Sequence, residues 1–385
     1  MKIFADQNIP FASEAFSTLT TNAEVVLFDG RTVTNEQLLD ADVLMVRSVT
    51  KVNKSLLADS KIKFVGSATI GTDHIDLEYL DSENISFANA PGCNATSASE
   101  YVVCGLLNHA RLNNISLSEM KVAVVGYGNV GSRVVQKLNA LDIKTFIYDP
   151  PRSSRHDDVD YVDWQHVMSC NVVTAHVPLT RTGDYPTKLM FNAEFFAALP
   201  EDCLFINTSR GGAVDEAALL KQLETKKINL ILDVWQNEPS INTTLLAKTE
   251  ISTPHIAGYS FDGKLRGTEM IYRAACQQLN VQASWDPSLV LAEETKGNIL
   301  HYAAQGIEDV AGLYSLLNEA YSIEADCQRL IDTMTLDTEQ RSQQFDLLRK
   351  HYPVRREFSY YRVSSVSISA KEISLLAKLG FNMSL

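Results

Sequence analysis

One short segment limits the possible folds of this chain more strongly than any other. Residues 121–125 form an apolar, strand-like run that leads directly into the sequence Gly-Tyr-Gly-Asn-Val-Gly at 126–131, and a second such run at 144–148 ends at an aspartate. In a dinucleotide-binding βαβ unit the three glycines allow a tight turn, a close approach of the backbone to a pyrophosphate, and close packing of the helix. The helix directs free N–H groups at the phosphates, and the acid accepts hydrogen bonds from a ribose. The segment predicts a Rossmann-type domain whose cofactor contacts are Gly126, Gly128, Asn129, Val130, Gly131 and Asp149.

Short apolar runs recur along most of the chain and alternate with segments that can form helices. They lie at 2–5, 24–27, 43–46, 63–66 and 85–88, and then at 171–175, 203–207, 230–233 and 250–252. Such alternation is typical of α/β folds with parallel sheets. Ser97 and Glu100 have the spacing of a capping box, which predicts the start of an apolar helix that runs to about residue 111.

Composition limits the partners of this chain of 385 residues. A net charge of −13 does not favour general binding to nucleic acid or to a membrane surface, because phosphate polymers need a basic face. The six cysteines form no CxxC pair, so we expect no metal site, no disulfide framework and a reducing, cytoplasmic location. The N-terminus reaches an acid at Asp6 before any long apolar stretch, and no apolar run has the length of a membrane span, so neither an export signal nor an anchor is expected.

Beyond about residue 286 the pattern changes to helical periodicity. It predicts helices at 309–321, 323–333 and 338–351, a strand at 358–364 and a last helix that ends at Gly380. This C-terminal region has no pattern typical of catalysis. Its aromatic cluster of Tyr352, Phe358, Tyr360 and Tyr361 is more typical of a core or an interface than of a ligand site. We therefore expect an α+β region that serves oligomerisation.

Three polar residues, Arg210, Glu238 and His255, follow the last three strands predicted before that region. Ligands of such sheets bind at the carboxyl ends of the strands, so these side chains are expected at the cofactor crevice. Oxidation of a secondary alcohol by hydride transfer needs a base for the hydroxyl proton, and a histidine beside a carboxylate suits that task. Arg210 can hold a substrate carboxylate through two parallel hydrogen bonds. The trio predicts a dehydrogenase of 2-hydroxy acids.

Each member of the trio has a plainer interpretation when it is taken alone. Glu238 could be a solvated turn residue, and His255 could satisfy a hydrogen bond in a core. Arg210 is followed by two glycines, which let backbone and ligand come close. The rival histidine, His74, belongs to the first predicted sheet and is expected to brace a loop. The position of the trio at three strand ends favours the catalytic interpretation.

With these residues the chain resembles the D-isomer-specific 2-hydroxyacid dehydrogenase family over roughly residues 1–281. The matching segments are 46–48, 71–76, 126–131, 209–212, 233–239 and 254–256. The resemblance implies an NAD-dependent enzyme whose catalytic residues are Arg210, Glu238 and His255. It also implies a flavodoxin-like substrate-binding domain at 1–98, completed by about 259–285, a Rossmann-type NAD domain at 99–258 and an α+β dimerisation domain at 286–385.

A narrower resemblance, to one branch of that family, is carried by residues 90–95, by residues 255–268 and by the helical C-terminal region. It implies a homodimer that oxidises 4-phospho-D-erythronate to 3-hydroxy-2-oxo-4-phosphooxybutanoate in pyridoxal 5′-phosphate biosynthesis. Further NAD contacts are expected at Val177, Ser209, Asp233 and Gly258, and substrate contacts at Ser48, Thr69 and Tyr259. At Val177 the branch often has a threonine, so only a backbone contact is expected there.

Several cations could hold the substrate's phosphate. Arg47 precedes Ser48 after an apolar strand and is a further substrate-binding candidate, although it could instead pair with an acid. Lys264 and Arg266 could attract phosphate or form the solvated face of a helix. Two other functions stay open, namely another 2-hydroxy acid dehydrogenase such as a 3-phosphoglycerate enzyme, and a non-catalytic NAD-sensing interaction protein, since a fold does not fix a function.

Overall fold

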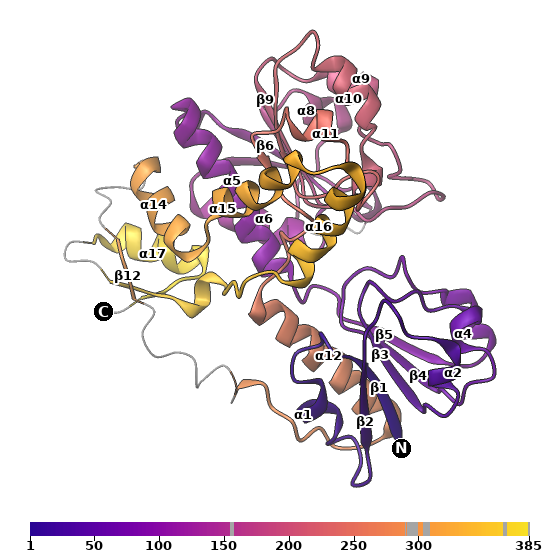
Figure 1. Ribbon diagram of the computed structural model, residues 1–385. Helices are drawn as coiled ribbons and strands as arrows, with labels where there is room; N and C mark the ends of the chain where they lie inside the picture. Colours follow the sequence, from indigo (N-terminus) through magenta and orange to yellow (C-terminus); the bar gives the residue numbers. More distant parts are fainter. Residues whose placement is uncertain (155–157, 289, 291–298, 303–308, 365–367, 384–385) are drawn as a thin grey trace. The chain divides into compact units, whose positions relative to one another are not determined.

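The alternating apolar runs form parallel strands, as the sequence predicts (Figure 1). The computed structural model describes residues 1–154, 158–288, 290, 299–302, 309–364 and 368–383. The chain divides into unit 1, made of Met1–Asn94 and Ser260–Gly297, and unit 2, made of Ala95–Tyr259 and Asn298–Leu385. Each unit has its own parallel sheet and its own apolar core.

The sheet of unit 1 has the strand order β2-β1-β3-β4-β5. All its strands are parallel, and this order is that of flavodoxin-like folds, so the flavodoxin-like fold that the sequence predicts is confirmed. Its strands are β1 (Lys2–Asp6), β2 (Glu24–Phe28), β3 (Val43–Val46), β4 (Phe64–Ser67) and β5 (Ser86–Asn89). Its helices are α1 (Ala12–Phe16), α2 (Asn35–Leu38), α3 (Lys54–Leu57), α4 (Leu77–Ser82) and α12 (Phe261–Leu279). Helix α12 packs against β4 and β5 and so returns the chain to this unit.

The sheet of unit 2 has the order β11-β10-β9-β8-β6-β7. The order of the strands reverses between β6 and β8, which is where doubly wound sheets bind their ligands. The strands are β6 (Lys121–Val125), β7 (Lys144–Tyr148), β8 (Val172–Ala175), β9 (Cys203–Asn207), β10 (Ile228–Leu232) and β11 (Ile251–Ser252). The helices are α5 (Ala95–Asn113), α6 (Asn129–Ala140), α7 (Pro150–Ser153), α8 (Trp164–Met168), α9 (Ala193–Ala198), α10 (Glu216–Gln222) and α11 (Thr243–Leu246).

Helix α5 starts earlier than the sequence predicts. It begins at Ala95, so Ser97 and Glu100 lie inside the helix and are buried, and the predicted capping box is wrong. The Glu100 carboxylate instead accepts a hydrogen bond from the backbone N–H of Phe358, at 3.0 Å. Glu100 therefore bonds to the C-terminal region and does not cap α5.

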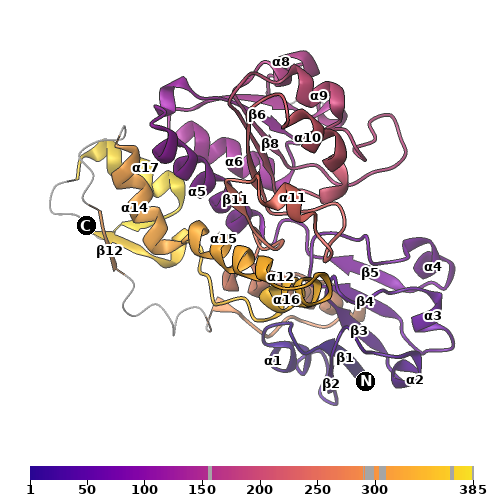
Figure 2. The same cartoon turned by 45° about the horizontal axis from the view of Figure 1, so that its top comes forward.

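The C-terminal region is an α+β arrangement that packs on helices α5 and α6. Its elements are β12 (Ile299–His301), α14 (Val310–Ala320), α15 (Ile323–Ile331), α16 (Thr338–Lys350), β13 (Arg362–Ser364), α17 (Ala370–Leu379) and β14 (Asn382–Met383). Figure 2 shows α14 beside α5 and α17 beside α6, and the same pairs are in contact. The strand predicted at 358–364 is shorter than expected, because Phe358–Tyr360 forms a 3₁₀ turn before β13.

Among the residues that the structure describes, we find no helix with both the length and the apolar character that crossing a bilayer requires.

Candidate active site

The glycine-rich turn after β6 has the geometry that dinucleotide binding needs. Gly126 has a φ of 94°, and a Cβ there would lie 2.6 Å from the carbonyl oxygen of His176. A Cβ on Gly131 would lie 1.9 Å from the carbonyl oxygen of Gly126, so the helix packs too closely for a side chain. A Cβ on Gly128 would meet no atom within 4 Å. The turn is therefore closed on two sides and open at the glycine where a pyrophosphate would approach.

The start of α6 is suited to an anion. Helix α6 begins at Asn129, followed by Val130, and its N-cap residue Gly128 has no side chain that could cap the helix. The free N–H groups and the positive end of the helix dipole are therefore available to phosphate groups. Asn129 and Val130 lie in the first turn, as the sequence predicts.

Asp149 lies at the end of β7, beside the glycine-rich turn. Its Oδ2 accepts a hydrogen bond from the backbone N–H of Tyr127 at 2.7 Å, and its Oδ1 accepts one from the backbone N–H of Arg152 at 3.1 Å. The guanidinium of Arg152 donates to the carbonyl oxygen of Tyr127, and its Cζ lies 5.7 Å from the ring centroid of that tyrosine. These bonds hold the Asp149 carboxylate beside the glycine-rich turn, where dinucleotide-binding motifs have the acid that contacts the ribose.

Val177 follows β8, and its side chain packs against the core of unit 2.

Glu238 and His255 are in direct contact. The Nδ1 atom of His255 lies 2.8 Å from Oε2 of Glu238, while Oε1 of Glu238 accepts a hydrogen bond from the backbone N–H of Trp235 at 2.9 Å. Burial alone would raise the pKa of Glu238, but the neighbouring His255 outweighs it and lowers that pKa. The carboxylate is therefore held ionised and aimed at one nitrogen of the imidazole, and Nε2 is left as the nitrogen that can exchange a proton with a ligand.

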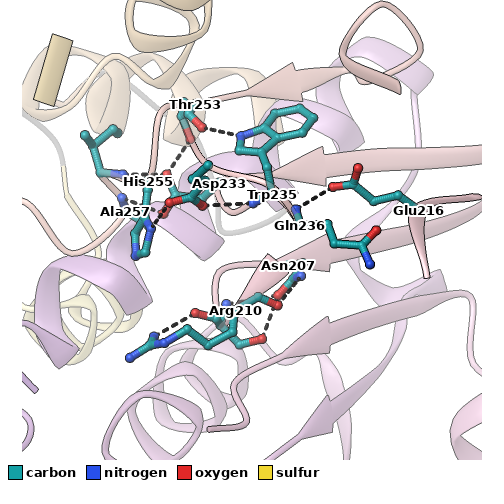
Figure 3. Close-up of polar contacts among 12 residues, drawn as sticks. Asn207, Arg210, Glu216, Asp233, Trp235, Gln236, Thr253, His255 and Ala257 are labelled. Carbon is teal, nitrogen blue, oxygen red and sulfur yellow. Dashed lines mark hydrogen bonds and ion pairs between the residues drawn. The ribbon is translucent and has the colours of Figure 1, made fainter. Parts of the chain in front are cut away.

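The loop that carries His255 is held by a buried carboxylate, that of Asp233 (Figure 3). Its Oδ1 accepts hydrogen bonds from the Thr253 hydroxyl and the Ile256 N–H, both at 2.7 Å, and its Oδ2 accepts one from the Ala257 N–H at 3.0 Å. Burial raises the pKa of Asp233. His255 itself has a φ of 58°, and its N–H donates to the carbonyl oxygen of Asp233 at 2.7 Å. These bonds set the direction of the loop, which continues to Gly258.

Arg210 follows β9, the strand next to β10. The Asn207 side chain ties this turn together by donating to the carbonyl oxygen of Arg210 at 3.2 Å and by accepting from the Ser209 hydroxyl at 2.7 Å (Figure 3). A Cβ on Gly211 would lie 1.9 Å from the carbonyl group of Trp235, so only glycine lets this turn pack on the segment that carries Glu238. The structure thus places Arg210 and the Glu238–His255 pair on the loops of three adjacent strands.

The remaining substrate candidates follow β3 and β4 of unit 1. Arg47 and Ser48 come directly after β3, and Thr69 follows β4, which pairs with β3 in parallel. The hydroxyl of Ser67 links the Thr69 hydroxyl, at 2.8 Å, to Nε2 of His74, at 3.1 Å. His74 therefore braces this edge of the sheet, in keeping with the interpretation from the sequence.

The structure also shows polar residues that the sequence did not single out. Glu216 on α10 accepts a hydrogen bond from the backbone N–H of Gln236, three residues after Asp233, at 2.7 Å. Arg355 of the C-terminal region is buried and donates to the carbonyl oxygen of Ala257 at 3.0 Å. Arg349 of the same region stands over the ring of Tyr259. No local pattern marks these residues, because their roles depend on contacts between segments that are distant in the sequence.

Comparison with known proteins shows the class to which this fold belongs. The family model of the D-isomer specific 2-hydroxyacid dehydrogenase NAD binding domain matches residues 94–257, and a model described as a domain of unknown function (DUF3410) matches residues 298–380. A solved 3-phosphoglycerate dehydrogenase from Entamoeba histolytica with bound NAD⁺ has a TM-score of 0.62 and 23% identity, and the match covers 74% of this chain and 98% of that one. The fold is that of the D-isomer-specific 2-hydroxyacid dehydrogenases.

Relatives that match over the whole length indicate a narrower family within this class. The erythronate-4-phosphate dehydrogenase of Marinobacter nauticus is 41% identical, and the match covers 100% of both chains. That of Colwellia psychrerythraea is 43% identical over 99% of this chain and 100% of its own. The chain belongs to the erythronate-4-phosphate dehydrogenase family.

Proposed function

We propose that the protein oxidises 4-phospho-D-erythronate to 3-hydroxy-2-oxo-4-phosphooxybutanoate with NAD, as a step toward pyridoxal 5′-phosphate. The whole-length identity of 41% and 43% to erythronate-4-phosphate dehydrogenases supports this substrate. The observation that carries the reaction type is the Glu238–His255 pair, with 2.8 Å between Oε2 and Nδ1, on loops next to the turn of Arg210. The comparisons favour this function over the 3-phosphoglycerate alternative, whose solved representative is 23% identical over 74% of the chain.

NAD fits the residues at the carboxyl edge of the unit 2 sheet. The open space at Gly128 and the uncapped start of α6 suit a pyrophosphate, and Asp149 suits the ribose hydroxyls. We assign further contacts to the loop residues Val177, Ser209, Asp233 and Gly258, with Val177 contributing its backbone. When bound, the nicotinamide of NAD supplies the acceptor for the hydride from C2 of the substrate.

The proposed mechanism divides three tasks among Arg210, Glu238 and His255. Arg210 holds the substrate carboxylate and so sets the position of C2. The Nε2 atom of His255 accepts the proton of the C2 hydroxyl, because Nδ1 is taken by Glu238. The Glu238 carboxylate keeps the imidazole in this orientation and stabilises the imidazolium that forms.

We assign the far end of the substrate to residues of unit 1, together with Tyr259. Arg47, Ser48 and Thr69 offer donors at one edge of that sheet. Burial, with a further contribution from the positive charge of Arg47, lowers the pKa of Lys264 to about 8. A phosphate placed near both cations would relieve this repulsion and favour the charged form of Lys264. The pair is our candidate for recognition of the terminal phosphate.

His255→Ala tests the assignment of the base. We expect kcat to fall by about 10² to 10⁴ while NAD affinity stays nearly the same, since the variant loses the proton acceptor and keeps the phosphate turn. Steady-state kinetics and a titration of NAD binding measure the two quantities. The matched control is His166→Ala, at an exposed position on α8, which should leave kcat within about twofold. A kcat within about tenfold of wild type for His255→Ala would remove His255 from the mechanism.

The C-terminal region is proposed to hold a homodimer, and the protein is proposed to work in the cytoplasm. Large apolar side chains of this region are exposed, among them Val354 and Ile299. All six cysteines are buried thiols, which suits a reducing compartment.

A further inference from the structure

The loop that carries His255 is held from two parts of unit 2 that are distant in the sequence. The first is Asp233, which follows β10 and binds three successive N–H groups of the loop (Figure 3). Its carbonyl oxygen accepts from His255 at 2.7 Å, and its carboxylate accepts from Ile256 at 2.7 Å and from Ala257 at 3.0 Å. Asp233 thus binds the N–H side of the loop.

The second part is the C-terminal region, which binds a carbonyl group of the same loop. Arg355 lies between α16 and the 3₁₀ turn Phe358–Tyr360 and is only 6% exposed. Its Nη1 donates to the carbonyl oxygen of Ala257 at 3.0 Å, and its Nη2 donates to that of Ser97 on α5 at 2.7 Å. Ala257 is therefore bonded at its N–H by Asp233 and at its carbonyl oxygen by Arg355.

The guanidinium of Arg355 is itself fixed in place. Its Cζ lies 3.6 Å from the centroid of the Tyr321 ring, at the end of α14. The hydroxyl of Tyr321 donates in turn to Oδ2 of Asp326 on α15, at 2.8 Å. A planar guanidinium that bonds two carbonyl groups and packs on an aromatic face cannot move without loss of at least one contact.

The backbone of His255 needs such support. Its φ of 58° lies in the left-handed region, which is unfavourable for a residue with a Cβ and persists where the surrounding contacts over-determine it. The side chain meets Oε2 of Glu238 through Nδ1, at 2.8 Å. A rotation of the backbone at His255 would therefore separate the imidazole from the carboxylate that orients it.

We infer that Arg355 is a positioning residue for the reaction, which keeps the His255 imidazole aligned by holding the carbonyl group of Ala257. The inference rests on the proposed role of His255 as the base. Misplacement of a reacting group by about 1 Å can lower a rate about 10²-fold, so a bond two residues from the base can matter for catalysis. The region at 298–380, matched by the model of a domain of unknown function, thereby acquires a task in addition to the proposed dimer contact.

The first test compares Arg355→Met with Lys137→Met in the full chain. Lys137 is the matched control, because it is also buried and donates to a backbone carbonyl, that of Leu379 at the end of α17. For Arg355→Met we expect the single-turnover rate of NAD reduction by 4-phospho-D-erythronate to fall at least about tenfold, while the Kd of NAD stays within about twofold. Lys137→Met should keep this rate within about threefold of wild type, although it too loses a buried contact.

The second test repeats Arg355→Met in a chain that already carries His255→Ala. If Arg355 acts through His255, the added substitution should lower the remaining rate by less than about threefold, because the imidazole that it positions is gone. A residue with a purely structural role would lower the rate by the same factor in both backgrounds.

Three results would overturn the inference. They are a rate for Arg355→Met within about threefold of wild type, a loss that is equal with and without His255, and an equal loss in Lys137→Met. If Arg355→Met does not fold, Arg355→Lys replaces it, since lysine keeps a charge near Glu100 but cannot span two carbonyl groups. Failure of both to fold would show a structural residue and would also overturn the inference.

The same measurements keep this inference distinct from the proposed function. Absence of turnover in the wild type would count against the proposed function. Normal turnover in His255→Ala would count against the proposed base. A wild type that is active, a His255→Ala variant that is impaired and an Arg355→Met variant that is unaffected would contradict the role of Arg355 alone.

Discussion

At the scale of single residues, the Glu238 carboxylate connects the backbone to His255, the proposed base. One oxygen accepts the Trp235 N–H and the other faces Nδ1 of His255, so the backbone fixes the direction from which the imidazole is held. Because the carboxylate is ionised, it stabilises the imidazolium that forms on proton uptake. Both orientation and charge should therefore be lost when this side chain is changed.

Glu238→Gln separates these two contributions, because it keeps the shape and removes the charge. Without the negative charge the His255 imidazolium is less stable, so the acid limb of the pH–rate profile should move to lower pH. We expect kcat to fall by about 10² or more, since the proton acceptor becomes a weaker base and its tautomer is no longer fixed. Profiles of kcat and kcat/KM against pH measure both effects, with the exposed Glu224→Gln as control. A profile that does not move would remove the pairing from the mechanism.

The sequence could predict which residues stand at the strand ends, but not how they are supported. Arg210, Glu238 and His255 each follow a recognisable apolar strand, and parallel strands bring such residues to one edge. Asp233 is predicted as a cofactor contact, yet its carboxylate oxygens already hold the His255 loop. That use depends on the conformation of residues 253–257, which no spacing encodes. The NAD contact of Asp233 stays a prediction.

At the scale of elements, apolar runs in the sequence predict where the strands lie. They do not predict which elements pack against one another. The strand predicted at 63–66 is observed as Phe64–Ser67, and that at 85–88 as Ser86–Asn89. Helical periodicity in the C-terminal region predicts that one face of each helix is buried, but it does not say against what. The structure buries α14 against α5 and α17 against α6, so this region shares the core of unit 2.

Buried charged side chains form hydrogen bonds between the C-terminal region and helices α5 and α6. Burial raises the pKa of Glu100 on α5 to about 8, and the nearby cations Lys137 and Arg355 act against that rise. Lys137 on α6 donates to the carbonyl oxygen of Leu379, and Arg355 donates to the carbonyl oxygen of Ser97 at 2.7 Å. Each of these groups makes a hydrogen bond to an element from the other part of unit 2. Removing one of the buried charges therefore leaves the others with less compensation for their burial.

Arg355→Met should therefore be strongly destabilising. The variant leaves Glu100 without one of its cations and removes the hydrogen bonds that Arg355 donates to the carbonyl oxygens of Ser97 and Ala257, at a cost of about 3–5 kcal/mol in the free energy of unfolding. Urea unfolding of the full chain measures this difference. Lys378→Met, at an exposed position on α17, is the control and should change stability by less than about 0.5 kcal/mol. A loss below about 1 kcal/mol for Arg355→Met would show that the buried network does not hold the region.

At the scale of the whole molecule, deletion of the C-terminal region is not a clean test of dimerisation. Removing the region would uncover α5 and α6, whose side chains share a core with it. Full-length chains with single changes avoid this problem, because surface substitutions leave that core intact.

We predict that the full chain sediments with twice the mass of one chain, and that Val354→Glu shifts it toward the monomer. Val354 is 78% exposed in the C-terminal region, and a charge there would be desolvated in an interface. Leu27→Glu, at a position 48% exposed in unit 1, is the matched control and should stay dimeric. Sedimentation of wild type as a monomer would contradict the dimer, and equal behaviour of the two variants would place the interface elsewhere.

The central claim concerns the substrate, and one measurement tests it most directly: NAD reduction by the purified full chain with 4-phospho-D-erythronate, D-erythronate and D-3-phosphoglycerate. We predict that kcat/KM for 4-phospho-D-erythronate exceeds that for D-erythronate at least about 10²-fold, because two or three charge-assisted contacts to the phosphate contribute about 1.5–3 kcal/mol each. It should also exceed that for D-3-phosphoglycerate, which lacks one carbon of the chain. Comparable values for the phosphorylated and plain four-carbon acids, or a preference for D-3-phosphoglycerate, would contradict the proposed function.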